Sequence, residues 1–570
     1  MICIHQKSGY VIVRAENCSL SERKGAEELR AFLFEATGIM LPIVTDETPA
    51  CDREIVVGKT SREGEEFSVD VDSLGDEGFV LRTVGEKIFI VGGAKRGTLY
   101  GVYTFLEDAV GYRWFTPDTT IAPKTKEIRV DTLDVRQKPV FSMREVMWKC
   151  GFDTEWSVRQ KVNRGHWRTF PREYGGGIVY AGWMCHTLGE LAETGYEAPE
   201  PCLTDPKIFE TVLKNCRKRL EEKPDAEILP VSQNDDFRYC TCENCRKVDE
   251  EEGSHAGTMI RFVNAVAREI KKDYPQIKVK TLAYQYTRKP PKTKPDDNVI
   301  VELCSIECCR SHALDECDVP APAPWAQLEE GESFQRDIRN WSKATSALHI
   351  WDYTTNYHHY FSPFPNLGCL RKNMRYFACN NVTGVLAQGA MNGGPSGEFG
   401  ELKNYVLAKL LWNPFMSEEE FNRHKREFMQ AYYGDGYEYI ETYMDELSEA
   451  VGERHIGIYY HPLRILPKES GVPLMERAFG LFERAKKTAR TSAQKLHVRR
   501  AQLQVRYYLQ IACRDEKYVN GTALERARYV KENQAIFAFI IKNDIYMNPD
   551  CHYPDDPDFT QSPDVWHKLG

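Results

Sequence analysis

Carboxylates follow two short apolar segments of this chain, at the places where strands of a sheet would end. Residues 228–232 are apolar and lead directly into Asn234, Asp235 and Asp236, and residues 299–304 lead into Glu307. Two carboxyl groups in different environments can act as an acid and as a base or nucleophile. Because adjacent carboxylates repel each other, one of Asp235 and Asp236 tends to hold a proton. A turn that uses Asn and Asp for backbone hydrogen bonds explains these residues equally well.

The ends of the other predicted strands carry side chains of the types that bind sugars. Aromatic rings stack on the C–H faces of sugars, and carboxylates, amides and histidines bind hydroxyl groups. The candidates for substrate binding are Asn234, Arg144, Glu145, Trp148, His186, Tyr284, Trp351, Asp352, Tyr353 and Glu398. Any one of them could instead pack in the core or cap a loop. The whole set favours a site, because loops at one face rarely collect such side chains by chance.

Three cysteines, Cys240, Cys242 and Cys245, lie within six positions. They could bind a structural zinc ion with a fourth ligand such as Cys308 or His255. The spacing is incomplete, so we favour a disulfide-stapled loop or free thiols and predict no metal site. Catalysis by a nucleophilic cysteine needs a paired base, and the sequence identifies none.

The predicted strands and helices place the ends of the strands at one face of a barrel. Seven apolar strands alternate with amphipathic helices, and the clearest helices cover residues 206–222, 259–272 and 402–412. The strands cover residues 140–148, 178–183, 228–232, 279–284, 299–304, 348–352 and 384–388. This alternation predicts an α/β fold with a (β/α)8-type barrel, possibly incomplete because an eighth strand is missing. In such a barrel the catalytic groups lie at the C-terminal ends of the strands.

Three domains are predicted. Residues 1–135 form a small α+β domain, in which a helix begins at Ser21 and ends at Gly38, and Gly85-Glu86 joins two strands. Residues 136–415 form the catalytic barrel. Residues 416–570 have a helical period and almost no strand pattern, so they form a helical domain.

The composition excludes several classes of function. The 570 residues carry a net charge of 75 − 84 = −9, with 42% hydrophobic and 28% charged residues. A globular, acidic chain of this kind is not expected to bind nucleic acid. It has no apolar run long enough for a membrane helix and no signal-peptide core. The 18 cysteines are too sparse for a disulfide scaffold. We therefore expect a cytoplasmic protein, although a secreted protein that has lost its signal peptide also fits.

Longer motifs resemble a known family. Residues 97–107 (GTLYGVYTFLE) and 111–117 (GYRWFTP) resemble the N-terminal domain that precedes α-glucuronidase and β-hexosaminidase barrels. Residues 231–236 (VSQNDD), the three cysteines and residues 281–291 (TLAYQYTRKPP) are similar to the barrel of glycoside hydrolase family 163, as are residues 303–309 (LCSIECC). The resemblance covers roughly residues 20–435.

The resemblance implies an endo-β-N-acetylglucosaminidase that cleaves the GlcNAc-β-1,4-GlcNAc core of complex N-glycans or glycopeptides. It also implies retention by substrate assistance, an exception to the enzyme-nucleophile scheme, without a metal or organic cofactor. Asp235 would polarise the acetamide and Glu307 would be the acid/base. The adjacent pair Asp235 and Asp236 is the second choice, and Asn234 could polarise the acetamide instead.

Three alternatives stay open. An exo-β-N-acetylhexosaminidase differs from an endo enzyme only in the closure of its pocket. An α-glucuronidase must bind a carboxylate, for which Arg144 and Arg288 are available. A non-catalytic glycan-binding protein on a decayed barrel is less favoured, because carboxylates are dense at the strand ends. The sequence contains no signal for an oligomeric state.

Overall fold

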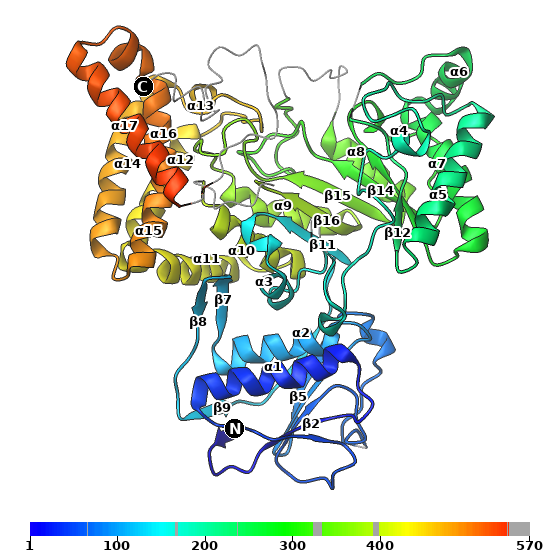
Figure 1. The fold of residues 1–570 in the computed structure, drawn as a ribbon, viewed down its shortest axis with the longest axis vertical. Coiled ribbons are helices and arrows are strands. Elements are labelled where there is room, and N and C mark those ends of the chain that lie inside the picture. The colour runs from blue at the N-terminus through cyan, green and yellow to red at the C-terminus, as the bar shows by residue number, and fades with distance from the viewer. Residues whose placement is uncertain are drawn as a thin grey trace. The chain divides into compact units, whose positions relative to one another are not determined.

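The computed structural model describes residues 1–64, 66–165, 169–235, 237–322, 333–390, 398–543 and 545 (Figure 1). The chain divides into two compact units. The first comprises Met1–Val140, Cys150–Gly177 and Leu411–Asn413, and the second comprises Phe141–Lys149, Ile178–Leu410 and Pro414–Gly570. Residues 150–177 thus group with the first unit, and the predicted limits of three domains at residues 135 and 415 stay a prediction.

The first unit is built on a mixed six-stranded sheet with the order β10-β5-β6-β4-β2-β3. Its strands are β2 (Val11–Arg14), β3 (Ile43–Thr45), β4 (Glu54–Val57), β5 (Phe79–Val84), β6 (Lys87–Gly92) and β10 (Asp134–Gln137). Two separate strand pairs are β1 (Ile2–His5) with β9 (Glu127–Val130) and β7 (Arg113–Thr116) with β8 (Thr119–Ile121). The helical elements are α1 (Leu20–Thr37), η1 (Asp72–Leu74), α2 (Gly97–Phe105), η2 (Leu106–Val110), α3 (Thr154–Arg159) and η4 (Arg172–Tyr174).

Helix α1 forms for reasons that are local in the sequence. Ser19 and Glu22 make a capping box at its start, and Gly38 ends it in the left-handed conformation with φ 74°. Leu29 and Leu33 face the core of the unit and are buried. The helix predicted between Ser21 and Gly38 is therefore present with the expected buried face.

A buried ion-pair network holds the middle of this sheet. Glu54 of β4 is almost fully buried and accepts hydrogen bonds from Arg62 Nε at 3.0 Å and Lys87 Nζ at 2.9 Å. Burial by itself would raise the pKa of Glu54. The bonds from Lys87, the Cys51 N–H group and Arg62 outweigh it and hold the pKa below its usual value.

Glu54→Gln should lower the free energy of unfolding by about 3 kcal/mol at pH 7, because Arg62 and Lys87 lose their buried counter-charge. The folded pKa of Glu54 lies below the unfolded value, so this stabilisation is present above the unfolded pKa of 4.5 and is lost as the pH falls through the folded pKa. Urea unfolding at pH 7 and at pH 4 measures both effects. An equal difference between wild type and variant at the two pH values would contradict the assignment.

The second unit contains a parallel sheet in which the described residues form six strands, ordered β11-β16-β15-β14-β13-β12. The strands are β11 (Met143–Met147), β12 (Ile228–Pro230), β13 (Lys278–Ala283), β14 (Val299–Cys304), β15 (Leu348–Tyr353) and β16 (Val382–Gln388). The first strand along the chain pairs with the last, as in a closed barrel. Tyr180 adds one parallel bridge to Ile228 beyond β12. In the described part of the chain no ladder joins β11 to this segment, so the sheet is an open, half-barrel form of the predicted barrel.

The strand predicted at residues 178–183 is wrong except for the bridge at Tyr180. Gly182 has φ 95°, and Gly175 and Gly176 before the segment also have positive φ values. Glycines in this conformation interrupt the extended backbone that a strand requires. The apolar pattern alone did not reveal this interruption.

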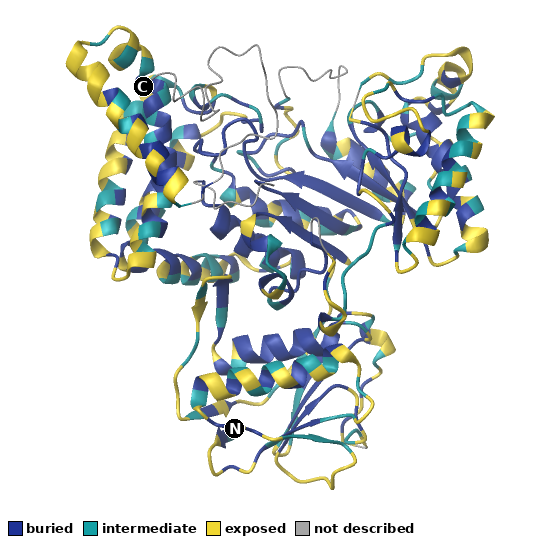
Figure 2. Ribbon diagram, in the orientation of Figure 1, coloured by how far each residue is buried: buried dark blue, intermediate teal, exposed yellow. Residues whose placement is uncertain are grey.

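Helices cover the outside of this sheet, while its strands are buried on both faces (Figure 2). Helix α7 (Ala256–Asp273) packs against β13, β14 and α5 (Pro206–Glu222). The other helical elements of this part are η3 (Lys149–Phe152), α4 (Leu188–Leu191), α6 (Glu243–Glu252), η5 (Gln285–Thr287), α8 (Phe334–Ala344), α9 (Leu367–Cys379) and α10 (Gly400–Trp412). Parallel sheets covered in this way read as continuous apolar runs, which is the pattern of the sequence.

The C-terminal region of the second unit is helical, as predicted. Its elements are α11 (Glu418–Tyr433), η6 (Gly434–Gly436), α12 (Tyr437–Val451), α13 (Pro462–Ile465), α14 (Lys468–Thr488), α15 (Ser492–Ala501), α16 (Leu503–Ala512), η7 (Asp515–Val519) and α17 (Ala523–Lys542). Helix α14 packs against α12, α15 and α16. None of the helices in the described residues has the length and apolar character needed to cross a membrane.

Candidate active site

Asp235, Tyr284 and Glu307 follow three neighbouring strands, β12, β13 and β14. The Tyr284 hydroxyl donates a hydrogen bond to Asp235 Oδ1 at 3.0 Å, and Gln285 Nε2 lies 3.5 Å from the same oxygen. Burial raises the pKa of Tyr284, and Asp235, Tyr459, Cys304 and Glu307 raise it further through their charges. Asp235 therefore contacts this phenol directly, whereas Glu307 follows the next strand and pairs with Arg288.

The side chain of Gln233 fixes the ends of β12 and β13 to each other. Gln233 Nε2 donates to the Tyr284 carbonyl at 3.0 Å, and the Thr287 hydroxyl donates to Gln233 Oε1. Gln285 adopts φ 52° as the chain turns into η5, an uncommon conformation for a residue other than glycine. The turn holds Tyr284 beside Asp235.

Glu307 is held by a buried ion-pair network. Arg288 Nη1 lies 3.1 Å from Glu307 Oε2, and Arg288 Nε lies 3.0 Å from Asp337 Oδ2. Trp341 Nε1 donates to the Arg288 carbonyl at 2.7 Å. Arg288 thus joins the loop after β13 to Glu307 and to helix α8.

A second buried ion pair, between Asp352 and Arg310, lies at the ends of β14 and β15. Asp352 Oδ1 accepts hydrogen bonds from the Ser305 hydroxyl and from Arg310 Nη1, each at 2.7 Å. The Arg310 guanidinium lies 5.8 Å from the centre of the Tyr353 ring. Asp352 therefore serves to hold Arg310 and the turn at Ser305.

Buried aromatic rings adjoin these charged groups. Trp351 Nε1 donates to Gln388 Oε1 at 2.7 Å, and the Trp351 and Tyr353 rings lie 6.2 Å apart and nearly parallel. Trp148 Nε1 donates to the Thr354 hydroxyl at 2.9 Å. Trp148, Trp351 and Tyr353 are each more than nine-tenths buried, so their rings pack mainly against protein.

His186 lies near Tyr284, and Asn234 directly precedes Asp235 in the chain. His186 has φ 50°, and its Nδ1 lies 2.9 Å from the Gln233 carbonyl, while its ring centre is 6.0 Å from that of Tyr284. Asn234 Oδ1 accepts from Gly189 N at 3.0 Å, and its Nδ2 donates to the Ala198 carbonyl at 3.2 Å. The amide of Asn234 thus binds the backbone of a neighbouring loop. Asp236 lies outside the described residues.

The other predicted residues lie deeper or farther along the strands. Arg144 and Glu145 are fully buried inside β11, and Arg144 Nη1 donates to the Phe141 carbonyl at 2.6 Å. Glu398 forms a buried ion pair with Lys403 of α10. Burial raises the pKa of Glu398 to about 7, although Lys403 opposes the shift. Arg144 and Glu145 lie within β11 and Glu398 precedes α10, so none of the three is placed at the end of β12, β13 or β14.

The sequence did not single out Tyr459, which lies in the C-terminal region. The segment that carries it is bound to the barrel by Arg310 N to the Ile456 carbonyl at 2.9 Å and Tyr357 N to the Ile458 carbonyl at 2.7 Å. The Tyr459 ring lies 6.1 Å from Tyr357, which is 5.9 Å from Tyr353. In the sequence, only the runs of tyrosine and histidine at residues 357–360 and 459–461 could have indicated that these two segments belong together.

The cysteines after Asp235 gain a partner that the sequence pattern did not indicate. Cys202, from the loop before α5, lies with Cys240, Cys242 and Cys245, and neither Cys308 nor His255 belongs to this group. His255 Nδ1 instead lies 2.8 Å from Asp249 Oδ2. Cys240, Cys242 and Cys245 form no disulfide bond, so of the two expected states of these cysteines the structure has the free thiols and not the disulfide.

Comparisons with solved structures agree with the fold. A family GH115 4-O-methyl-α-glucuronidase with specificity for decorated arabinogalactans matches with a TM-score of 0.61 and 12% identity, over 96% of this chain and 78% of that chain. A GH138 enzyme that targets pectin rhamnogalacturonan II matches with a TM-score of 0.43 and 10% identity, over 95% and 74% of the two chains. At 12% identity the match to the GH115 enzyme bears on the fold alone.

Two family profiles match this chain, one at its N-terminal end and one over its middle. Residues 8–105 match the profile described as the glycosyl hydrolase family 67 N-terminus. No curated protein matches the chain. Residues 114–445, more than half of the chain, match the profile described as a domain of unknown function, DUF4838. The chain therefore belongs to the DUF4838 family.

Proposed function

We propose that this protein is a glycoside hydrolase whose catalytic carboxyl groups are Asp235 and Glu307. The observation that carries the proposal is that Asp235, Tyr284 and Glu307 follow three neighbouring strands and that the Tyr284 phenol donates to Asp235. The half-barrel fold and the match to a glycosyl hydrolase N-terminal domain support it. In parallel α/β folds, groups at the C-terminal strand ends are the ones that meet substrate.

The specific reaction that we propose is retaining cleavage of a β-linked GlcNAc residue, in the core of complex N-glycans or glycopeptides. The acetamido carbonyl oxygen attacks C1 as the bond from C1 to the leaving oxygen breaks. One carboxylate takes the acetamide N–H as a hydrogen-bond donor, and the other carboxyl group gives its proton to the leaving oxygen. This attack forms an oxazoline. Water then attacks C1, the bond from C1 to the acetamido oxygen breaks and restores the acetamide, and the water returns a proton to that second group.

The two carboxyl groups have different surroundings, which a division of roles requires. We assign Asp235 to the acetamide and Glu307 to acid/base catalysis. In its ion pair with Arg288, Glu307 is a carboxylate, so this assignment requires that substrate binding moves Arg288 toward Asp337. The reverse assignment needs no such movement, and the leaving-group experiment in the Discussion distinguishes the two.

A neutral sugar suits the charges at this site better than a uronic acid. Arg288 is bound to Glu307 and Asp337, and Arg310 is bound to Asp352. A glucuronidase, such as the GH115 enzyme of similar fold, must bind the carboxylate of its sugar. Either arginine would have to leave an acidic partner to do so, which costs several kcal/mol for a buried pair.

Mass spectrometry of a biantennary complex N-glycopeptide after incubation with the protein tests this proposal. We expect release of a glycan that ends in one GlcNAc, with one GlcNAc left on the peptide. Stepwise loss of single terminal sugars would show an exo-β-N-acetylhexosaminidase instead. If the glycopeptide is unchanged and glucuronylated oligosaccharides lose glucuronic acid, the protein is an α-glucuronidase and the GlcNAc proposal fails.

Tyr284→Phe should lower kcat by about tenfold with little change in KM, because the hydrogen bond that orients Asp235 is worth about 1.5 kcal/mol. Initial rates on the substrate identified above measure the effect. Tyr274→Phe is the matched control, since Tyr274 ends helix α7 on the outer side of the barrel. Equal activity of Tyr284→Phe and wild type would remove Tyr284 from the site.

A further inference from the structure

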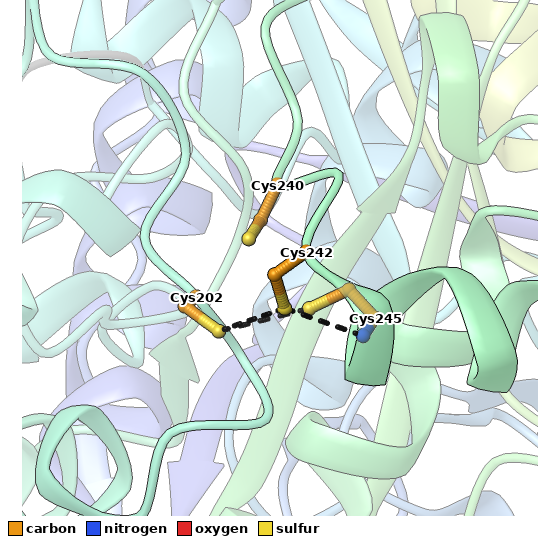
Figure 3. Close-up of side chains that lie close together, drawn as sticks. All are labelled: Cys202, Cys240, Cys242 and Cys245. Atoms are coloured by element: carbon orange, nitrogen blue, oxygen red, sulfur yellow. Dashed lines mark hydrogen bonds between the residues drawn. The ribbon is translucent and has the colours of Figure 1, made fainter.

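The sulfur atoms of Cys202, Cys240, Cys242 and Cys245 converge on one point beside the loop that carries Asp235 (Figure 3). Cys202 Sγ lies 3.7 Å from Cys242 Sγ and 3.8 Å from Cys245 Sγ. All four sulfurs lie within 4.8 Å of one another. Cys202 precedes α5, whereas Cys240 and Cys242 precede α6 and Cys245 lies in its first turn, so local chain geometry alone does not explain their convergence.

These distances are those of thiolates around a zinc ion. Zinc binds cysteine sulfur at about 2.3 Å in a tetrahedron, which places any two sulfurs about 3.8 Å apart. A disulfide would bring two of them to about 2.05 Å. The Cys245 N–H group also donates to Cys242 Sγ at 3.5 Å, an interaction that stabilises negative charge on the sulfur.

We propose that Cys202, Cys240, Cys242 and Cys245 bind one structural zinc ion. Four protein ligands complete the tetrahedron and leave no position for water or substrate. The ion replaces one proton on each thiol, so four protons are released when it binds. It joins the loop before α5 to the loop after β12, which already meet through Glu200 N and the Arg238 carbonyl at 3.0 Å.

A second cluster, Cys309, His312, Cys317 and His455, independently has the geometry of a Cys2His2 site. Cys309 Sγ lies 3.3 Å from His312 Nδ1, and Cys317 Sγ lies 3.5 Å from His455 Nδ1. The four ligand atoms lie within 4.8 Å of one another. Zinc bonds of about 2.3 Å to sulfur and 2.1 Å to nitrogen place these atoms about 3.6 Å apart. The geometry assigns a second structural zinc ion to this cluster.

The second ion would join the loop after Glu307 to the C-terminal region. His455 precedes the segment that carries Tyr459, and Ile456 of that segment accepts a hydrogen bond from Arg310 N at 2.9 Å. Each candidate carboxylate is thus followed in the chain by a loop that zinc holds. Any effect of zinc on turnover rests on the proposed function, whereas the two zinc sites do not.

The zinc content of the purified protein, measured by plasma mass spectrometry after growth with added zinc, tests both sites without a substrate. We expect two zinc ions per chain in the wild type and one in each of the single-site variants Cys202→Ser and His455→Ala. Cys379→Ser is the matched control, because Cys379 is exposed and outside both clusters, and it should retain two.

X-ray absorption at the zinc edge identifies the ligands in each variant. His455→Ala should show four sulfur neighbours at about 2.3 Å, and Cys202→Ser should show two sulfur and two nitrogen neighbours. If a variant fails to fold, stepwise blocking of thiols in the wild type with an organomercurial should release both zinc ions to a colorimetric chelator.

Each proposed site can fail separately. Suppose that the wild type binds one zinc ion per chain. If His455→Ala still binds this ion, the second site is overturned; if Cys202→Ser still binds it, the first site is overturned. A chain with iron instead of zinc, or with neither metal, overturns both. A variant that loses turnover but keeps two zinc ions would count against the proposed function and would leave both zinc sites standing.

Discussion

Asp235→Asn and Glu307→Gln should each lower kcat on a β-linked GlcNAc substrate by about 10³-fold, within the range that acid–base catalysis contributes. Each replacement keeps the shape of the side chain and removes its charge. Asp235 is exposed and accepts from Tyr284, so its variant should fold normally. Glu307 is buried against Arg288, so the folding of its variant is checked by circular dichroism.

The leaving group distinguishes the two roles. With an activated 4-nitrophenyl glycoside, the variant of the general acid should recover much of its activity, because this leaving group departs without a proton. The variant of the acetamide-binding carboxylate should stay slow on both substrates, since the attack on C1 is impaired. Recovery in Glu307→Gln supports our assignment, and recovery in Asp235→Asn supports the reverse one.

Asp225→Asn is the control for the loss of one negative charge, since Asp225 is exposed and pairs with Lys223 at the surface. Its activity should match that of the wild type. If Asp235→Asn and Glu307→Gln also stay within about twofold of the wild type on a confirmed substrate, the site lies elsewhere, and the proposed carboxylate pair is wrong.

The second large effect concerns the buried ion pair between Lys280 of β13 and Glu302 of β14. Lys280 Nζ lies 2.5 Å from Glu302 Oε2, and both side chains are fully buried. By strand alternation they share the sheet face of Tyr284. Glu302→Gln should lower the free energy of unfolding by about 3–5 kcal/mol, because Lys280 loses the charge that compensates its burial.

Replacement of both partners should cost much less. Lys280→Met with Glu302→Leu removes the charges and keeps the volume, and such replacements are often neutral or stabilising by about 1–4 kcal/mol. Urea unfolding at pH 7 measures all variants. Asp297→Asn, which breaks the exposed pair between Lys271 and Asp297, is the control and should cost less than about 1 kcal/mol. A single variant Glu302→Gln as stable as this control would contradict the prediction.

Features with local causes could be predicted from the sequence. Helix α1 has its cap at Ser19, its stop at Gly38 and its buried face within one short segment. The hairpin turn at Gly85-Glu86 joins β5 and β6, with Val84 opposite Lys87. The buried strands of the parallel sheet appeared as apolar runs, because both of their faces are covered. The mixed α/β class followed from these elements.

The partners of the functional side chains could not be predicted in the same way. Asp235 and Glu307 were identified as chemical groups, but the sequence contains no sign that Tyr284 donates to one of them or that Arg288 pairs with the other. The apolar segment around Gly182 looked like a strand, since its pattern does not report a backbone angle. Tyr459 was missed because it lies far along the chain from the barrel.

The cysteine cluster shows most directly which features the sequence determines and which depend on the tertiary structure. The sequence by itself determined that Cys240, Cys242 and Cys245 lie within six positions, shortly after Asp235. Only the tertiary structure decided that Cys202 completes the group and that Cys308 and His255 do not. The physical reason is that patterns of residue type follow from local backbone periodicity and burial, whereas a contact between distant segments depends on how whole elements pack.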